Sequence, residues 1–408
     1  MHCARNSAHS QTIIQRSTIP STPMMTSRSN GLDTLRTCAI VLVFMNHYMA
    51  FVSVEPTFGW FSSAGQMGVD LFFVLSGYLI GNQLFAGIAH QGKISISLTA
   101  FYARRALRTW PVFWVVLAAY FIFPTAMGGR EPPALWRFLT FTQNYQLQPG
   151  TAFSHAWSLC IKEQFYLVLP LLALLAVRVG SRKSQAWTLL ASLVCIGIGA
   201  RIVLWLQYGG EDAGNINSYY PNIYYATLCR FDEFLPGIAI ALLKNFHPAL
   251  WQPIQTRGRQ TLAIGLIAVA AMTYGTNVYF YQDGYGYGFL MTAFGYSLSA
   301  TAFALLVMSA LSQTSPLHYV RIPGAYTIAL WSYSIYLSHK AIFYIIGKQA
   351  KAISLDPSLR LLAITVCTLL VGASLYYLIE APFMRIRDRR FPHLFSASRR
   401  SIDAQVAR

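Results

Sequence analysis

The apolar stretch LRTCAIVLVFMNHY, at 35–48, contains two ionisable residues eleven positions apart, Arg36 and His47. On a helix, eleven steps of 100° make three turns plus about 20°, so both residues lie on one face, about 16 Å apart along the axis. A long substrate on that face could contact both residues. An acyl-CoA has this shape, with a phosphate-rich nucleotide, a pantetheine arm and a terminal thioester. Taken alone, each residue also fits a structural role, as a snorkelling arginine and a packed, hydrogen-bonded histidine.

Further charged residues interrupt the apolar stretches. Placing an unpaired charge at the centre of a bilayer costs about 2.5–3.5 kcal/mol of insertion free energy, so such residues by default mark a functional site. The rise of a helix places ionisable side chains from several helices at a similar depth: His47, Asp70, His155, Glu163, Arg230, Asp232, Glu233, His339 and Lys340. We therefore expect one shared cavity, with His47, Asp70 and Glu163 as catalytic residues. Asp70 could hold the histidine ring in one tautomer by accepting its N–H, or could only cap its helix. The adjacent Lys162 and Glu163 diverge by about 100° and should serve different partners.

A second basic group lies in FYARRALRTWP, at 101–111. Arg105 and Arg108 are three residues apart and face the same way on a helix. Guanidinium groups suit phosphate oxygens, which makes the pair a candidate site for the nucleotide of a donor. Such clusters also determine membrane topology or bind anionic lipid headgroups.

The composition predicts the elements that position these residues. Of 408 residues, 55% are hydrophobic and 11% are charged, and the mean hydropathy is +0.42. A soluble domain carries about twice that charged fraction. The sequence therefore predicts an all-α, polytopic membrane protein. Ten membrane-spanning helices are expected at 34–53, 68–88, 109–127, 155–177, 186–207, 224–244, 260–276, 289–311, 325–347 and 360–380.

The basic residues orient the predicted helices. Twenty-one of the 31 lysines and arginines fall in segments on the side of the N-terminus, and four fall in loops on the other side. The positive-inside rule then predicts that both termini are cytoplasmic. The net charge of +17 is spread over short clusters between apolar segments, which argues against a nucleic-acid partner.

Three segments are expected along the chain. These are a disordered cytoplasmic tail at 1–30, a transmembrane domain at 31–383 and a basic cytoplasmic tail at 384–408. The six cysteines show neither disulfide nor metal-site spacing, so we expect no metal. Since the chain ends shortly after the tenth predicted helix, no appended extracytoplasmic domain is expected.

Several motifs resemble acyltransferase family three, integral membrane proteins that acylate bacterial polysaccharides, lipid-linked sugars and some antibiotics. They are LDTLRTCAIVLVFMNH (32–47), GVDLFFVLSGYLI (68–80), FYARRALRTWP (101–111) and HAWSLCIKEQFY (155–166), followed by weaker landmarks to about 390. The resemblance implies that His47 is the essential histidine, that Arg36 is its paired arginine, and that Arg105 and Arg108 lie near the acyl donor. The sequence departs from the family pattern at Lys162, usually glutamate, and at Lys340, usually tryptophan.

The expected function is acyl transfer, with acetyl as the expected group, from cytoplasmic acetyl-CoA to a hydroxyl of a cell-surface, exported or lipid-linked carbohydrate. The expected location is a bacterial inner (plasma) membrane, among its lipids. His47 would act as general base or as acyl relay. The substrate-binding candidates are Arg230, Glu233 and His339, and either Arg230 or Lys162 could stabilise the oxyanion. The acceptor and the oligomeric state stay open.

A sugar or lipid flippase is the competing prediction. Buried charges and glycine-interrupted helices are equally expected in a transporter. Transporters often contain internal repeats, however, and we find none between the two halves of this sequence.

Overall fold

The computed structural model describes residues 29–91, 97–179, 183–210 and 215–391. The predicted disordered tail at 1–30 falls almost wholly outside this part, and so does most of the basic tail at 384–408. The first residues of that basic tail are helical, because α18 (Ala381–Arg390) continues from the preceding helix.

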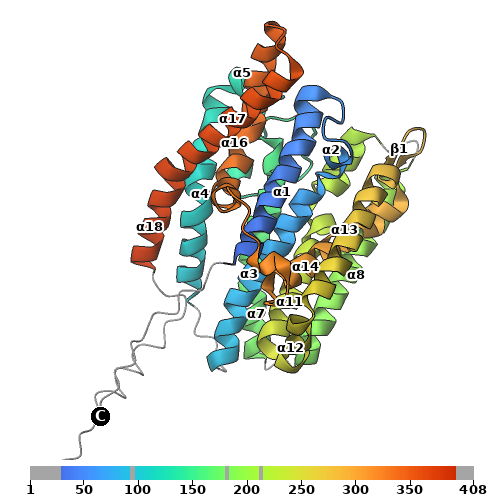
Figure 1. The fold of residues 1–408 in the computed structure, drawn as a ribbon, viewed down its shortest axis with the longest axis vertical. Coiled ribbons are helices and arrows are strands. Elements are labelled where there is room, and N and C mark those ends of the chain that lie inside the picture. The colour runs from blue at the N-terminus through green and yellow to red at the C-terminus, as the bar shows by residue number, and fades with distance from the viewer. Residues whose placement is uncertain (1–28, 92–96, 180–182, 211–214, 392–408) are drawn as a thin grey trace, which may run out of the picture.

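Long helices, running mostly along one direction, make up the body of the molecule (Figure 1). They are α1 (Asn30–Tyr48), α3 (Met67–Gln91), α4 (Leu98–Ile122), α7 (Trp157–Arg178), α8 (Lys183–Tyr208), α11 (Leu235–Phe246), α13 (Gly258–Tyr279), α14 (Tyr296–Leu311), α16 (Ala325–Ala352) and α17 (Pro357–Leu375).

Short elements connect or extend these helices. The helical ones are η1 (Met49–Ser53), α2 (Trp60–Ala64), α5 (Pro124–Met127), α6 (Leu135–Leu139), η2 (Ser154–Ala156), α9 (Ile216–Tyr219), η3 (Tyr220–Tyr224), α10 (Thr227–Arg230), η4 (Phe231–Phe234), α12 (Pro248–Thr256), η5 (Met291–Gly295), α15 (Pro316–Tyr319) and η6 (Tyr376–Glu380). A small antiparallel hairpin pairs β1 (Tyr281–Gln282) with β2 (Gly286–Tyr287).

Seven helices in the described part of the chain are long and apolar enough to cross a membrane. They coincide with the predicted spans other than 109–127, 224–244 and 325–347. Those three ranges are also largely helical, in α4, in α10 to α11 and in α16. The chain is therefore a multi-pass, all-α membrane protein, while the number of ten spans and the side on which the termini lie stay predictions.

The two ends of the bundle differ. We call the end where α1 begins and α18 finishes the tail end, and the opposite end, where α1 continues into η1, the loop end (Figure 1). Because α1 starts at the tail end, Arg36 lies near that end and His47 lies near the loop end.

Glycines bring α3 and α11 into close contact. A Cβ added to Gly77 would lie 2.1 Å from the carbonyl oxygen of Phe234, and one added to Gly237 would lie 2.1 Å from that of Val74. No side chain fits at either position, so these two glycines permit the close approach of the helices.

The predicted helix at 224–244 is broken. Arg230 ends α10 with φ near −129°, η4 follows, and Pro236 opens α11. Proline has no N–H to donate to a preceding turn and fits the first turn of a new helix. The break turns Arg230, Asp232 and Glu233 into the protein interior, where all three are buried.

Candidate active site

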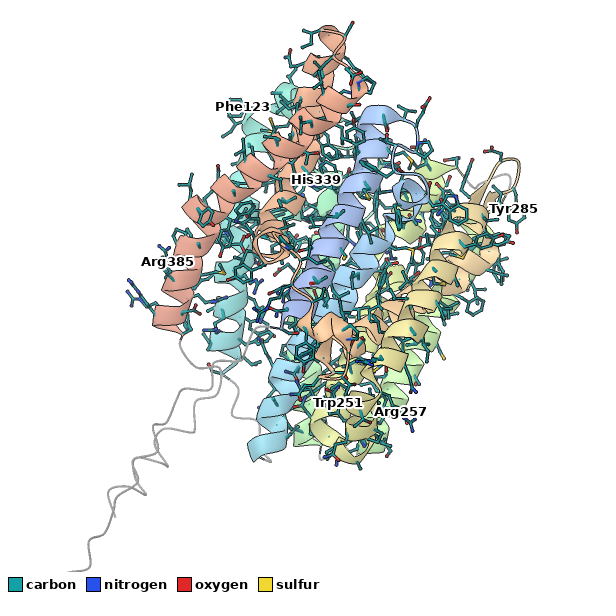
Figure 2. The ribbon with its side chains drawn as sticks, viewed as in Figure 1. Phe123, Trp251, Arg257, Tyr285, His339 and Arg385 are labelled. Atoms are coloured by element: carbon teal, nitrogen blue, oxygen red, sulfur yellow. The ribbon has the colours of Figure 1, made fainter. Side chains whose placement is uncertain are left out.

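Three cavities follow one another from the tail end toward the loop end. The tail-end cavity, of about 920 Å³, is lined by Arg36, Arg108, Lys244 and Arg385. The middle cavity, of about 110 Å³, lies between α1, α3, α4, α7 and α16. The histidine cavity, of about 200 Å³, is lined by His47, His155 and a group of aromatic side chains. Figure 2 shows Arg385 on α18 toward the tail end and His339 inside the bundle.

Lining residues link the cavities to one another. Arg36, Leu79 and Arg108 line both the tail-end and the middle cavity. Tyr336 lines both the middle and the histidine cavity. Arg36 and His47 therefore border the same series of spaces from one helix, as their eleven-residue separation predicted.

The Tyr336 hydroxyl makes two hydrogen bonds at the junction of the middle and histidine cavities. It donates to the carbonyl oxygen of His155 and lies 2.7 Å from the Ser158 hydroxyl. Because the phenol has only one proton to donate, Ser158 must donate to Tyr336. The Tyr336 side chain thus borders both the basic middle cavity and the histidine cavity.

His47 is fixed in one tautomer by its neighbour. Its Nδ1 lies 2.6 Å from Nε2 of His339. The other ring nitrogen of His339 lies 2.8 Å from the carbonyl oxygen of Tyr336, and a carbonyl only accepts, so that nitrogen carries the proton. In neutral His339, Nε2 is then an acceptor, and His47 donates to it through Nδ1–H. This leaves Nε2 of His47 unprotonated, with no hydrogen-bond partner among the described residues.

Two further groups complete the histidine cluster. The ring of His155 lies 5.1 Å from that of His339 and 6.4 Å from that of His47, centroid to centroid. Its Nε2 bonds the Leu337 carbonyl at 3.1 Å, and its buried Nδ1 has no partner in the described part of the chain. Lys340, next to His339, donates to the Thr151 carbonyl at 3.0 Å and to the Ser154 hydroxyl at 2.8 Å.

Asp70 contacts Arg230 in place of His47. Its Oδ1 accepts from Nη2 of Arg230 at 2.7 Å, and Glu233 accepts from Nε of the same guanidinium. Aromatic rings enclose Arg230, with the Tyr296 centroid 4.1 Å from its central carbon. The expectation that Asp70 orients His47 is therefore wrong for this structure. The spacing within α3 could not show this, because the choice of partner depends on how α3 packs against the segment formed by α10 and η4.

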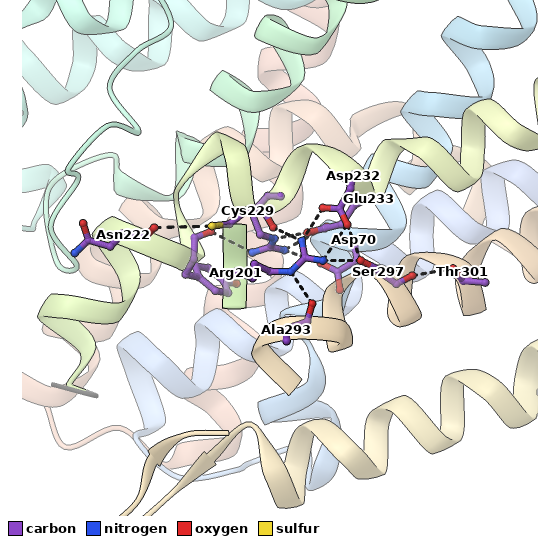
Figure 3. Close-up of polar contacts among 11 residues, drawn as sticks. Asp70, Arg201, Asn222, Cys229, Asp232, Glu233, Ala293, Ser297 and Thr301 are labelled. Carbon is purple, nitrogen blue, oxygen red and sulfur yellow. Dashed lines mark hydrogen bonds and ion pairs between the residues drawn. The ribbon is translucent and has the colours of Figure 1, made fainter. Parts of the chain in front are cut away.

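A second buried ion pair extends the network around Arg230 (Figure 3). Arg201 of α8 donates to both oxygens of Asp232, at 2.7 and 3.0 Å, and to the Cys229 and Ala293 carbonyls. Ser297 also donates to Asp232, at 2.5 Å. We call Asp70, Arg201, Arg230, Asp232 and Glu233 the ion network. Because Arg230 and Glu233 are both 0% exposed, the two predicted substrate-binding residues lie in this network and not on the histidine cavity.

Glu163 is also separated from the histidines. It accepts a hydrogen bond of 3.4 Å from Nε1 of Trp110 and lines a different cavity, between α4 and α7. Lys162 lines the middle cavity. These neighbours line different cavities, as their divergence on the helix predicted. The single cavity expected for all the ionisable side chains at this depth is wrong.

The structure therefore gathers the predicted residues into separate groups. Arg36, Arg105 and Arg108 line the middle cavity together, and His47 meets His339. His155 and Tyr336 were not among the candidate site residues predicted from the sequence. His155 is the first residue of the predicted helix at 155–177, but nothing in the sequence showed that it faces α1 and α16. No group of His, Cys, Asp or Glu that could hold a metal ion occurs among the described residues.

Comparison with known proteins identifies the same family that the sequence motifs resemble. The acyltransferase domain family matches residues 29–377. The chain is 31% identical over 235 residues to the peptidoglycan O-acetyltransferase OatA of Listeria monocytogenes, covering 53% of this chain and 34% of that protein. It is 25% identical over 391 residues to the O-acetyltransferase OatA of Staphylococcus aureus, covering 89% of this chain and 58% of that protein.

A third relative is the putative peptidoglycan O-acetyltransferase YrhL of Bacillus subtilis, 29% identical over 228 residues, covering 52% of this chain and 33% of that protein. The chain thus spans between a third and three fifths of the length of these relatives. No solved structure matches it. Since the family match covers most of the chain, including the helices that carry both histidines and the arginines, the protein belongs to acyltransferase family three.

Proposed function

We propose that this protein transfers an acetyl group from acetyl-CoA to a hydroxyl of a carbohydrate, with Nε2 of His47 as the atom that acts on the hydroxyl. The observation that carries the proposal is the 2.6 Å contact between His47 and His339. It leaves the unprotonated nitrogen of a neutral imidazole at a cavity, which is what a general base or a nucleophile requires.

The donor would lie along the series of cavities. Arg36, Arg105 and Arg108 would bind the phosphates of the nucleotide, since a guanidinium offers several donors to phosphate oxygens. The pantetheine arm would pass through the middle cavity and displace Tyr336. The distance of about 16 Å along α1 between Arg36 and His47 suits that arm. With the tail end in the cytoplasm, the donor would enter from the compartment that contains CoA.

The acceptor would bind in the histidine cavity from the loop end. Trp157, Tyr220, Tyr224 and Tyr225 line this cavity and offer aromatic surfaces with hydroxyl groups, which suit a sugar ring. The relatives from Listeria and Bacillus are named for peptidoglycan, so a glycan of the cell surface is the proposed acceptor class.

The reaction balances without a metal or a redox partner. Nε2 of His47 takes the proton of the sugar hydroxyl as its oxygen attacks the thioester carbonyl. The C–S bond breaks, a C–O ester bond forms, and the leaving thiolate takes the proton to give CoA and acetylated sugar. In the relay variant, Nε2 attacks the thioester carbonyl, an N–C bond forms and the C–S bond breaks to release the CoA thiolate. The sugar oxygen then attacks the acetyl group, the N–C bond breaks, and the hydroxyl proton passes by way of His47 to the thiolate.

The proposal is tested with the purified full chain in lipid nanodiscs. Release of the CoA thiol from acetyl-CoA is measured with and without a glycan acceptor, and acetylated glycan is identified by mass spectrometry. We expect acceptor-dependent thiol release that His47→Ala abolishes. Thiol release without acetylated product, or activity retained by His47→Ala, would overturn the assignment. Labelled acetyl-CoA without acceptor separates the two routes, because only the relay leaves label on the protein.

A further inference from the structure

Four cations line the middle cavity: Arg36, Arg105, Arg108 and Lys162. No aspartate or glutamate is among its described lining residues. The remaining polar lining is rich in hydroxyl groups, from Ser76, Thr109, Ser158, Ser332, Tyr166 and Tyr333. Such a composition suits a ligand that accepts hydrogen bonds and carries negative charge.

The four cations differ in how they are compensated. Arg36 pairs with Asp33 at 2.9 Å, and Arg105 donates to Gln83 at 2.6 Å. In the described part of the chain, neither Arg108 nor Lys162 has a hydrogen-bond acceptor or an ion-pair partner. The ammonium of Lys162 lies only over the Phe72 ring, 5.6 Å from its centroid. Glu163 and Glu380 act on these two cations only from beyond hydrogen-bond distance. Charges without a direct partner are costly inside a membrane protein, so two of them in one cavity indicate an anionic ligand.

We propose that Lys162, together with Arg108, binds the diphosphate of the nucleotide thioester in the middle cavity. This inference rests on the proposed function and adds a residue to it, since Lys162 stands where the family pattern has a carboxylate. The diphosphate carries two adjacent negative charges, and the two cations would bind them from α7 and α4. Arg36, at the border with the tail-end cavity, would then bind the rest of the nucleotide.

A purely structural role for Lys162 is the alternative, with Glu163 as its counter-ion. The geometry argues against it, because Glu163 faces the cavity between α4 and α7, where it accepts from Trp110. The phosphate of an anionic lipid would offer the same chemistry as a nucleotide. We favour the nucleotide because the middle cavity is surrounded by five helices and leads, past Tyr336, to the unprotonated nitrogen of His47.

The test measures binding, so that it does not depend on turnover. Wild type, Lys162→Met, Lys162→Arg and the matched control Lys183→Met are purified in nanodiscs of neutral phosphatidylcholine. Lys183 is an exposed lysine that donates to the Phe246 carbonyl, so its substitution removes the same charge elsewhere. Isothermal titration calorimetry gives the affinity of each protein for CoA and for pantetheine, which has no phosphate. Inorganic pyrophosphate serves as competitor.

We expect Lys162→Met to weaken CoA binding about tenfold or more, as loss of a charged hydrogen bond does. The affinity of this variant for pantetheine should stay within about twofold of the wild-type value. Pyrophosphate should compete with CoA less well in this variant than in wild type. Lys162→Arg should restore most of the affinity, and Lys183→Met should resemble wild type. An equal loss for CoA and pantetheine, or no loss for either, would overturn the proposal.

Two further outcomes separate this inference from its premise. If wild type binds CoA through Lys162 but transfers no acetyl group, the anion site stands and the proposed function fails. If wild type transfers acetyl groups and Lys162→Met binds CoA normally, the anion site alone fails. Reduced retention of phosphatidylglycerol by Lys162→Met, with CoA binding unchanged, would assign the cavity to a lipid headgroup and also overturn the proposal.

Discussion

The ion network and the histidine cluster are both buried groups of ionisable side chains, yet they differ in how completely they are bonded. In the ion network, the guanidinium of Arg201 reaches Asp232, Ser297 and two carbonyls, and Arg230 reaches Asp70 and Glu233. In the histidine cluster, Nε2 of His47 and Nδ1 of His155 have no partner among the described residues. Ionisable side chains whose hydrogen bonds are all satisfied fix the packing of helices. A nitrogen lone pair that lies beside a cavity without a hydrogen-bond partner is available for chemistry.

The strongest test of this comparison is His47→Ala. Loss of the general base should lower the rate of acetyl transfer by about 10²–10⁴-fold. The thermal unfolding midpoint of the purified protein should change little, because His47 makes one hydrogen bond and borders a cavity. If His47→Ala instead lowers the unfolding midpoint and keeps the specific activity of wild type, His47 has a structural role like that of the ion network.

Arg230→Met should give the opposite pattern. It leaves Asp70 and Glu233 buried without their cation, which costs about 3–5 kcal/mol of folding free energy. We expect a lower unfolding midpoint and a lower yield of folded protein in detergent. Adding Asp70→Asn and Glu233→Gln should recover part of the loss, because the unpaired charges are then removed. Normal stability of the single variant would contradict the structural assignment.

His339→Ala should have an intermediate effect on rate. Without its acceptor, His47 Nδ1–H is no longer held, and loss of a hydrogen bond worth about 1–3 kcal/mol predicts a fall in kcat of about 10–100-fold. His318→Ala is the matched control, since the one hydrogen bond of the His318 ring to a described residue is to the Ala310 carbonyl, near the tail end. An equal fall in the rate of thiol release in both variants would mean that the effect of His339→Ala does not arise from its contact with His47.

Tyr336→Phe should have the smallest effect. It removes the hydroxyl that bonds Ser158 and His155 but keeps the ring between the two cavities, so we expect a change in rate of about 3–10-fold. Tyr145→Phe, at an exposed loop position, should behave like wild type. A loss as large as that of His47→Ala would give the hydroxyl a direct part in the chemistry.

The sequence predicted the features that are local to one helix. The apolar stretches gave the helices, the arithmetic of 100° per residue placed Arg36 and His47 on one face, and the same arithmetic separated Lys162 from Glu163. These follow from helix geometry alone.

Partners on different helices could not be predicted in the same way. The carboxylate of Asp70 and the ring of His339 are both at a suitable depth for His47, and only the packing of α1 against α16 makes His339 the neighbour. The break before Pro236 was missed for a similar reason. Its apolar flanks, LC and FLPGIAIALL, predicted one continuous span, whereas in the structure ion pairs connect the broken segment to α3 and α8.

The position of Tyr336 has a consequence for the membrane itself. An open water path through the bundle would let protons leak and dissipate the gradient on which a cell depends. In this structure the phenol ring of Tyr336 borders both the space lined by the arginines and the space lined by the aromatic side chains. A thioester arm that pushes the ring aside would fill the gap it opens, so insulation would be kept during each turnover. Liposomes containing Tyr336→Ala should then lose a pH gradient faster than those containing wild type, and CoA should slow that loss.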